Sequence, residues 1–326
     1  MRSENLPIPG RTEKADLHFH TTLSDGGATS AEAVEECVRN GVAFAVATEH
    51  DVVNREFPAL ATKAGIRTLE GVEVSARAPV GDGKVKHLHL TAYAHLFVPQ
   101  IDPVLTETRI GRVTKMRLQC EDLARVGFDI DHARFLAHFE NGGFDLANLT
   151  NFHLAEYLVS RPTTAKIAKS IAGVAVTKPH DFIGLFLKRE SPFPVGVPKN
   201  FPEYEPEAVK IARIVVGGSH GVLSVAHPNF TFAKEGTEAF ENGIAENLVE
   251  TGINGIELNP HATPEWTETV LRVKKRFGLV LTFGSDCHFL KNKTGDGRHS
   301  AVGETHAYLT GEKIREKTAR LLAALG

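Results

Sequence analysis

The sequence has little cysteine and no long apolar segment. Its 326 residues include three cysteines, Cys37, Cys120 and Cys287, and no two of them are spaced as C-x-x-C. This argues against a disulfide framework and a zinc finger, and we expect a protein of the reducing cytoplasm. No stretch approaches the ~18 uninterrupted apolar residues of a transmembrane helix. The polar opening MRSENLPIPG is also unlike a secretion signal, so we expect no membrane partner.

Strong net charge is absent too, and so are two common nucleotide-binding motifs. The formal charge of −3 gives no reason to expect binding to long nucleic acids. The chain contains neither a G-x-x-x-x-G-K-[ST] loop nor a G-x-G-x-x-G fingerprint. Apolar residues at 42% and charged residues at 24% are typical of globular proteins. Against this ordinary background, 16 histidines beside only 1 tryptophan and 4 tyrosines are an excess, and their positions decide whether it reflects metal chemistry.

Short apolar runs alternate with helical patterns towards both ends of the chain. Seven runs are strand candidates: residues 15–19, 42–47, 67–74, 87–94, 221–226, 255–258 and 279–283. A turn at Gly81-Asp82-Gly83 predicts a hairpin between the third run and the fourth. Strands that alternate with helices predict an α/β fold whose sheet is closed as a barrel or open.

The first helix is predicted from its end signals. Ser30 is a candidate N-cap, and Gly41 lies just past the expected end. Helical spacing places Ala31, Val34 and Val38 on one face, which we expect to be buried.

The middle of the chain differs from its two ends. Residues 104–202 contain helical patterns at 106–126 and 152–172 and no comparable strand run. They carry 13 basic against 10 acidic residues, whereas the rest of the chain is acidic. We therefore predict an α/β domain formed by residues 12–103 and 203–326, with a helical insertion between them. A slightly basic insertion suits a lid over an anionic substrate, and a solvated helical excursion is the alternative.

Histidines and carboxylates are concentrated near the ends of the predicted strands. They are His18, His20 and Asp25, then Glu49, His50 and Asp51, then Glu73, His87 and His89, and finally His227, Asp286 and His288. Parallel strands end on one face, where active sites form. Each group alone has an ordinary structural explanation, and we expect at most one of His87 and His89 to be a ligand. Together they would repel one another and lose solvation unless cations neutralise them.

These residues predict a metal site with more than one ion. Imidazole and carboxylate without thiolate suit Zn, Mn or Fe(II) rather than an all-oxygen Mg or Ca site. The candidates outnumber the ligands of a single ion, so we predict two or three divalent ions. Clustered ions lower the pKa of bound water to about 7 and stabilise phosphoryl transfer, which predicts a hydrolase. Cys287 lies between two candidates, and we assign it to packing rather than to nucleophilic catalysis.

The motifs around these residues resemble those of the PHP (polymerase and histidinol phosphatase) family. The matching segments are Asp16-Leu17-His18-Phe19-His20, Asp25-Gly26, Thr48-Glu49-His50-Asp51, Gly71-Val72-Glu73-Val74-Ser75, His89, Ala226-His227-Pro228 and Gly284-Ser285-Asp286-Cys287-His288. The resemblance implies a distorted seven-stranded (β/α) TIM-like barrel with a trinuclear metal site. Carried over by position, it implies one ion held by His18, His20, Glu73 and Asp286, a second held by Glu73, His89 and His227, and a third held by Asp25, His50 and His288.

Within the family, the segment order and the insertion resemble the bacterial phosphoesterases that act on nucleotides or short RNA. That branch places an arginine two residues before a histidine of the insertion, where this chain has Asn151-Phe152-His153. It places another after His-Pro, where this chain has Asn229-Phe230. Other groups must then hold the substrate phosphate, or the substrate differs. The candidates for binding substrate are His153, Arg161 and Lys199.

We therefore predict a metal-dependent phosphoesterase that hydrolyses a phosphomonoester of a nucleotide or short oligonucleotide, with a metal-bound hydroxide as nucleophile. Asp286 or His288 is expected to take up the water proton, and His153 or a metal-bound water to protonate the leaving group. The alternatives are a histidinol-phosphate-type phosphatase, hydrolysis of an amide, and a non-catalytic module that the ions stabilise.

Overall fold

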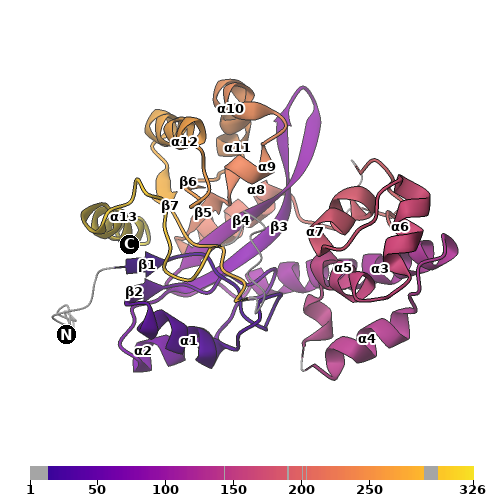
Figure 1. Cartoon of the computed structure of the whole chain (residues 1–326). Helices are drawn as coiled ribbons and strands as arrows, with labels where there is room; N and C mark the ends of the chain where they lie inside the picture. The colour runs from indigo at the N-terminus through magenta and orange to yellow at the C-terminus, as the bar shows by residue number, and fades with distance from the viewer. Residues whose placement is uncertain (1–13, 143, 189–190, 200, 203, 290–299) are drawn as a thin grey trace.

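Seven strands form two sheets in a computed structural model of the chain, which describes residues 14–142, 144–188, 191–199, 201–202, 204–289 and 300–326 (Figure 1). The strands are β1 (Lys14–Asp16), β2 (Val42–Ala45), β3 (Glu70–Gly81), β4 (Lys84–Ala94), β5 (Val222–Val225), β6 (Gly255–Glu257) and β7 (Val280–Thr282). β1 and β2 form one sheet, and the other five lie side by side in chain order. Each strand overlaps one of the seven predicted runs, and β3 and β4 form the predicted hairpin. The mixed α/β fold is therefore confirmed.

The described strands do not close into the barrel that the resemblance implies. Between the two sheets, pairing is reduced to isolated bridges such as Phe19 with Cys287 and His50 with Glu73. Side-chain hydrogen bonds explain one interruption. The Asp16 carboxylate, at the end of β1, accepts from the backbone N of His18 (3.2 Å) and of Ser285 (3.0 Å), which takes both amides out of a ladder. The breaks in the sheet thus fall next to the predicted site.

Helices cover these sheets. They are α1 (Ser30–Arg39), α2 (Glu56–Lys63), α8 (Ala208–Ala212), α9 (Pro228–Thr231), α10 (Gly236–Ala239), α11 (Ala245–Glu250), α12 (Pro264–Phe277) and α13 (Gly311–Ala324), with π-helical turns η3 (Arg213–Gly218) and η4 (Phe240–Ile244). Among the helices that the structure describes, none is long and apolar enough to cross a membrane.

The N-terminal cap and the buried face of α1 both differ from the prediction. Thr29, not Ser30, is the N-cap, and it forms a capping box with Glu32. Ser30 instead points inward and accepts a hydrogen bond from Asn54 Nδ2 at 3.0 Å. The helix is therefore rotated relative to the prediction, and Val38, expected to be buried, is 40% exposed.

Residues 104–202 form helices around a core of their own. α3 (Ile101–Arg125) leads into α4 (His132–Glu140), η1 (Leu146–Asn148), α5 (Asn151–Val159), α6 (Thr164–Ala172), α7 (Pro179–Phe182) and η2 (Ile183–Leu187). Figure 1 shows α4 to α7 gathered beside the sheets. Phe135 and Phe186 belong to this core and not to the core of the strands. The single helix predicted over 152–172 is interrupted near Pro162, which lacks an amide proton.

The insertion contacts the loop that follows the first histidines. Asn148 Nδ2 donates to the backbone oxygen of Leu23, and Thr150 Oγ1 donates to Asp25 Oδ2 at 3.5 Å. The segment that carries α3 to α7 therefore borders the predicted site. The predicted domain limits at positions 12 and 203 lie outside the described residues.

Gly284, in the segment after β7, lies against His18. A Cβ added there would lie 2.3 Å from His18 Cβ and 2.4 Å from its N. We predict that Gly284→Ala lowers the free energy of unfolding by about 1–3 kcal/mol, because two backbone segments must move apart. Gly243→Ala is the control, since nothing lies within 4 Å of its added Cβ. Urea unfolding of both variants measures the difference, and equal stability would contradict the prediction.

Candidate metal centre

Nine of the predicted side chains converge at one end of the strands. They are His18, His20, Asp25, His50, Glu73, His89, His227, Asp286 and His288. The Glu73 carboxylate lies at their centre, and nitrogens of five histidines lie 3.0 to 3.3 Å from its oxygens. Several imidazoles around one buried carboxylate make an environment suited to cations.

The ligand atoms fall into three groups, and the atoms of each group lie within 4.8 Å of one another. The groups are His18, His20, Glu73 and Asp286; then His50, Glu73 and His89; then His20, Asp25, His50 and His288. The first equals the set that the resemblance implies, while the second contains His50 in place of His227 and the third contains His20 in addition. His227 Nε2 lies 3.0 Å from Glu73 Oε1, beside the second group. Metal bonds of about 2.0–2.2 Å place neighbouring ligand atoms about 3–3.5 Å apart, which matches these separations.

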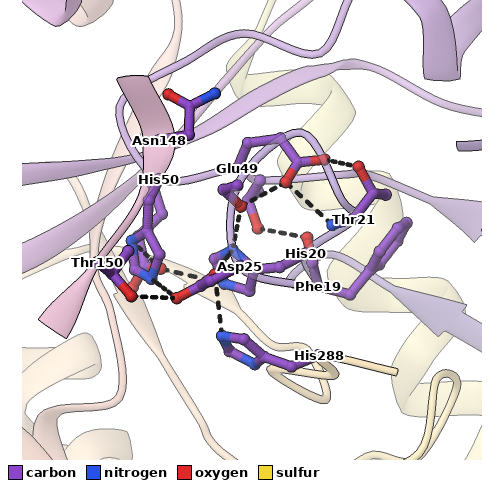
Figure 2. A network of polar contacts seen from close by, with 12 residues as sticks. Phe19, His20, Thr21, Asp25, Glu49, His50, Asn148, Thr150 and His288 are labelled. Atoms are coloured by element: carbon purple, nitrogen blue, oxygen red, sulfur yellow. Dashed lines mark hydrogen bonds and ion pairs between the residues drawn. The ribbon is translucent and has the colours of Figure 1, made fainter. Parts of the chain in front are cut away.

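Asp25 gives an independent sign that the centre suits cations. Its Oδ1 is buried and has no hydrogen-bond partner in the part of the chain that the structure describes. His288 Nε2 lies 3.3 Å from this oxygen and His20 Nδ1 3.7 Å (Figure 2). An unpaired buried carboxylate oxygen is costly, and a bound cation would satisfy it. Nitrogen and carboxylate donors without sulfur fit Zn, Mn or Fe(II).

The backbone is strained at the same place. Asp51, His227 and Asp286 have φ angles of 54°, 29° and 53°. Residues other than glycine adopt such conformations at a cost of about 1–3 kcal/mol each, and they persist where the surrounding structure enforces them. These conformations change the direction of side chains at the ends of strands and support a functional role for the cluster.

Burial lowers the pKa of the histidines in the cluster, whereas the neighbouring carboxylates raise it. Burial disfavours the charged form of His20, but hydrogen bonds to Asp286 and Glu73 outweigh it and raise its pKa to about 10. Burial also disfavours the charged form of His18, but the charges of nearby carboxylates outweigh it and raise its pKa well above its usual value. Burial prevails for His50, whose pKa lies well below its usual value. Without metal, protons therefore supply part of the positive charge that cations would bring.

Two buried carboxylates outside the cluster hold its members in place. His18 Nδ1 donates to Glu257 Oε2 at 2.7 Å, which leaves Nε2 facing the centre. Glu49 accepts from Thr21 N (2.9 Å), Ser24 Oγ (2.5 Å) and Asn54 Nδ2 (2.9 Å) and so fixes the loop before Asp25 (Figure 2). Glu257 was missed as a functional residue. Its position at the end of β6 is the signal that could have found it, because the other candidates also follow strands.

The remaining candidates lie outside the cluster of nine side chains, which His153 borders through Thr150. His153 is buried, and its Nδ1 accepts from Thr150 N at 3.0 Å, which caps α5. Burial lowers the pKa of His153 to about 4. The Arg161 guanidinium stacks 4.2 Å above the Tyr157 ring, and Lys199 is exposed. Among the contacts between described residues, none joins Arg161 or Lys199 to the cluster.

Two neighbours of the cluster match their predictions. His87 is half-exposed and lies 3.6 Å from Glu205, so only His89 of that pair faces Glu73. Cys287 is buried in an apolar cluster that includes Phe19 and Phe57, as a packing role requires.

A further sequence motif lies outside the cluster. Gly217–Gly221 matches the G-x-S-x-G pattern of a nucleophile elbow. Such an elbow leads from a strand into a helix, whereas Ser219 lies between η3 and β5. Its hydroxyl accepts from Val98 N (3.1 Å) and donates to Ile214 O (3.2 Å), so Ser219 has a structural role.

Comparison with known proteins agrees with this centre. No family model matches the chain. The chain is 40% identical over 288 residues to a 3′,5′-nucleoside bisphosphate phosphatase of Chromobacterium violaceum, and the match covers 84% of this chain and 86% of the relative. A phosphoribosyl 1,2-cyclic phosphate 1,2-diphosphodiesterase of Eggerthella lenta is 26% identical over 276 residues, 84% of this chain and 93% of the relative.

A solved structure shares the fold. It is described as an amidohydrolase of Chromobacterium violaceum with bound sulfate and no metal, and it matches with a TM-score of 0.70 over 94% of this chain and 96% of that one, at 22% identity. With the relative at 40% identity, the chain belongs to the PHP family of metal-dependent phosphoesterases, which are hydrolases. The resemblance of the sequence motifs is thus confirmed.

The metal-free protein should lose stability as the pH rises. His20 has a pKa of about 10 in the folded chain against 6.5 for an ordinary histidine, so folding takes up a proton between these values. This stabilisation is complete below about pH 6.5 and is lost as the pH rises through about 10. Metal-loaded protein holds neutral imidazoles and should lack this loss. Thermal unfolding of both forms across this range checks the prediction, which a flat profile of the metal-free form would contradict.

Glu257→Gln should weaken metal binding without unfolding the chain. The amide keeps the shape of the side chain but loses the charge that orients His18, and such outer partners contribute about 10–100-fold to metal affinity. Glu268→Gln is the control, because the Glu268 side chain is 74% exposed. Competition with a chelating dye measures both affinities. An affinity of Glu257→Gln equal to that of the control would show that Glu257 does not support the centre.

Proposed function

We propose that the chain is a metal-dependent phosphatase that hydrolyses a phosphomonoester of a nucleotide or short oligonucleotide. The observation that carries the proposal is the Glu73 carboxylate among five imidazoles, with the unpaired oxygen of Asp25 close by. The relative with 40% identity is named as a phosphatase of nucleoside bisphosphates, which supports this substrate class.

The proposed ligand sets follow the three groups. His18, His20, Glu73 and Asp286 would hold one divalent ion; Glu73, His89 and His227, with His50 nearby, would hold a second; and Asp25, His50 and His288 would hold a third. Two or three ions of Zn, Mn or Fe suit these donors. When bound, such ions stabilise phosphoryl oxygens and lower the pKa of a bound water to about 7.

The protein's own groups orient the ligands and move protons. His288 Nδ1 donates to the backbone oxygen of Asp286 at 2.9 Å, which leaves Nε2 to face Asp25 as a ligand. Asp286 is the better candidate of the two to accept the proton of the attacking water, since both nitrogens of His288 are then engaged. His153 is a weak candidate to protonate the leaving group, because a pKa of about 4 leaves it neutral near pH 7.

The insertion, proposed to span residues 104–202, forms one wall of the site. Its separate core and the contact of Thr150 with Asp25 support this division of the chain. The seven strands and the bridges between the two sheets support an opened form of the seven-stranded barrel as the family architecture.

A substrate panel tests the proposed function. Purified protein is loaded with Mn, Zn or Fe(II) and assayed for phosphate release from 3′,5′-bisphosphonucleosides, nucleoside monophosphates, histidinol phosphate, sugar phosphates and 5′-phosphorylated short RNA. An amide panel runs in parallel. Turnover of nucleotides above the other classes supports the proposal. Bound metal without turnover of any phosphoester would favour a non-catalytic module.

Glu73→Ala should abolish activity and lower the metal content. The carboxylate faces five imidazoles, so its loss removes a bridging ligand and should reduce turnover at least about 100-fold. Secondary structure, followed by circular dichroism, should change little. His87→Ala is the control and should keep its metal, because His87 lies outside the cluster. Near-normal activity of Glu73→Ala would refute the proposed centre.

A further inference from the structure

Arg112 is a buried cation that the sequence motifs do not include. It lies within α3 and is 9% exposed. Its Nη2 contacts Asp51 Oδ2 and lies 3.5 Å from Ser75 Oγ. The Tyr204 phenol also lies close to the guanidinium, but Nη1 is buried and has no hydrogen-bond partner within the described part of the chain. A guanidinium carries five donors in a planar fork, so a buried unpaired edge is unfavourable unless a ligand pairs with it.

The two partners of Arg112 place it at the edge of the metal centre. Asp51 directly follows His50 in the chain. Ser75 lies two residues beyond Glu73, on the same face of β3, and is paired with His89 across the hairpin. The guanidinium is therefore next to the group formed by His50, Glu73 and His89.

The centre is most accessible on this same side. The side chains of His18 and Glu73 are 0% and 1% exposed, whereas that of His89 is 39% exposed. A substrate that reaches the centre beside His89 passes Ser75 and Arg112. The free edge of Arg112 thus borders the approach to the ligands.

The charges around Arg112 leave one edge for an anion. Asp51 occupies the edge that carries Nη2 and holds the guanidinium in a fixed orientation. Asp25 and Glu205 are the other carboxylates that act on the guanidinium; Asp25 belongs to the cluster, and Glu205 pairs with His87 at 3.6 Å. Arginine binds two oxyanions at once because its donors point in different directions, and phosphate matches this geometry well.

We propose that Nη1 of Arg112 donates a hydrogen bond to an oxygen of the substrate phosphate, while Asp51 and Ser75 hold the guanidinium. This inference rests on the proposed function and names the residue that binds the phosphate. The contact is present in the bound substrate and persists during reaction, so Arg112 contributes to binding more than to turnover.

The test uses Arg112→Gln and Arg112→Lys in the full metal-loaded chain. Lysine keeps a cation beside Asp51 but loses the fork, so it separates phosphate binding from support of Asp51. Arg117→Gln is the control, since Arg117 lies on the same helix with a side chain that is 50% exposed and paired with Glu121. The measurements are KM, kcat, inhibition by inorganic phosphate, and metal content.

For both Arg112 variants we expect KM and the inhibition constant of phosphate to rise at least about 10-fold, with kcat within about threefold and metal content unchanged. Wild-type values of both constants in Arg112→Lys would overturn the inference, even if Arg112→Gln failed to fold. Loss of metal with an unchanged phosphate constant in Arg112→Lys would overturn it in favour of a supporting role. Failure of the wild-type protein to hydrolyse any phosphoester would instead contradict the proposed function.

Discussion

The metal centre depends on the balance of charge around the buried Glu73 carboxylate. Imidazole nitrogens approach its oxygens to 3.0 Å, and the Glu73 side chain itself is 1% exposed. Carboxylates packed this closely need positive charge, which protons or metal ions can supply. The raised pKa of His18 and of His20 shows that protons take this role without metal. Protons and ions compete for the same lone pairs, so metal loading must displace protons.

The buried carboxylates of the chain divide into two kinds by their hydrogen bonds. Asp16 accepts from backbone and side-chain donors, including Ser285 Oγ at 2.6 Å, and Glu49 is equally well supplied. These two tie segments of the fold together. Asp25, by contrast, keeps a buried oxygen that has no hydrogen bond among the described residues and faces only imidazole nitrogens of the cluster. Residues of one chemical type thus serve structure where donors surround them and suit cations where donors are absent.

The sequence was informative wherever a local pattern determines the structure. All seven strands lie within or across the predicted runs, because buried strands are short apolar segments between turns. The candidate ligands could be named because they lie at or near the ends of these strands. The break near Pro162 was missed although a proline within a helical pattern is itself a local signal. The inward turn of Ser30 was missed because it depends on a contact with Asn54, which is distant in sequence. The sequence left open whether the sheet closes, because the interruption depends on Asp16 accepting from the amide of Ser285, 269 residues away.

The insertion shows why substrate-binding residues are harder to predict than ligands. Two of the candidates named from the sequence, Arg161 and Lys199, make no contact with the centre among the described residues, whereas Arg112 contacts a residue adjacent to His50. Hydrophobic periodicity can identify the buried face of α3 but not the residues that this face contacts. A buried arginine within a long helix also belongs to no recognisable sequence motif. Such a cation needs an anion near each edge, and Asp51 supplies only one. The edge of Arg112 that carries Nη1 is recognised only once α3 is packed against the strands. Through this edge, the insertion borders the metal centre.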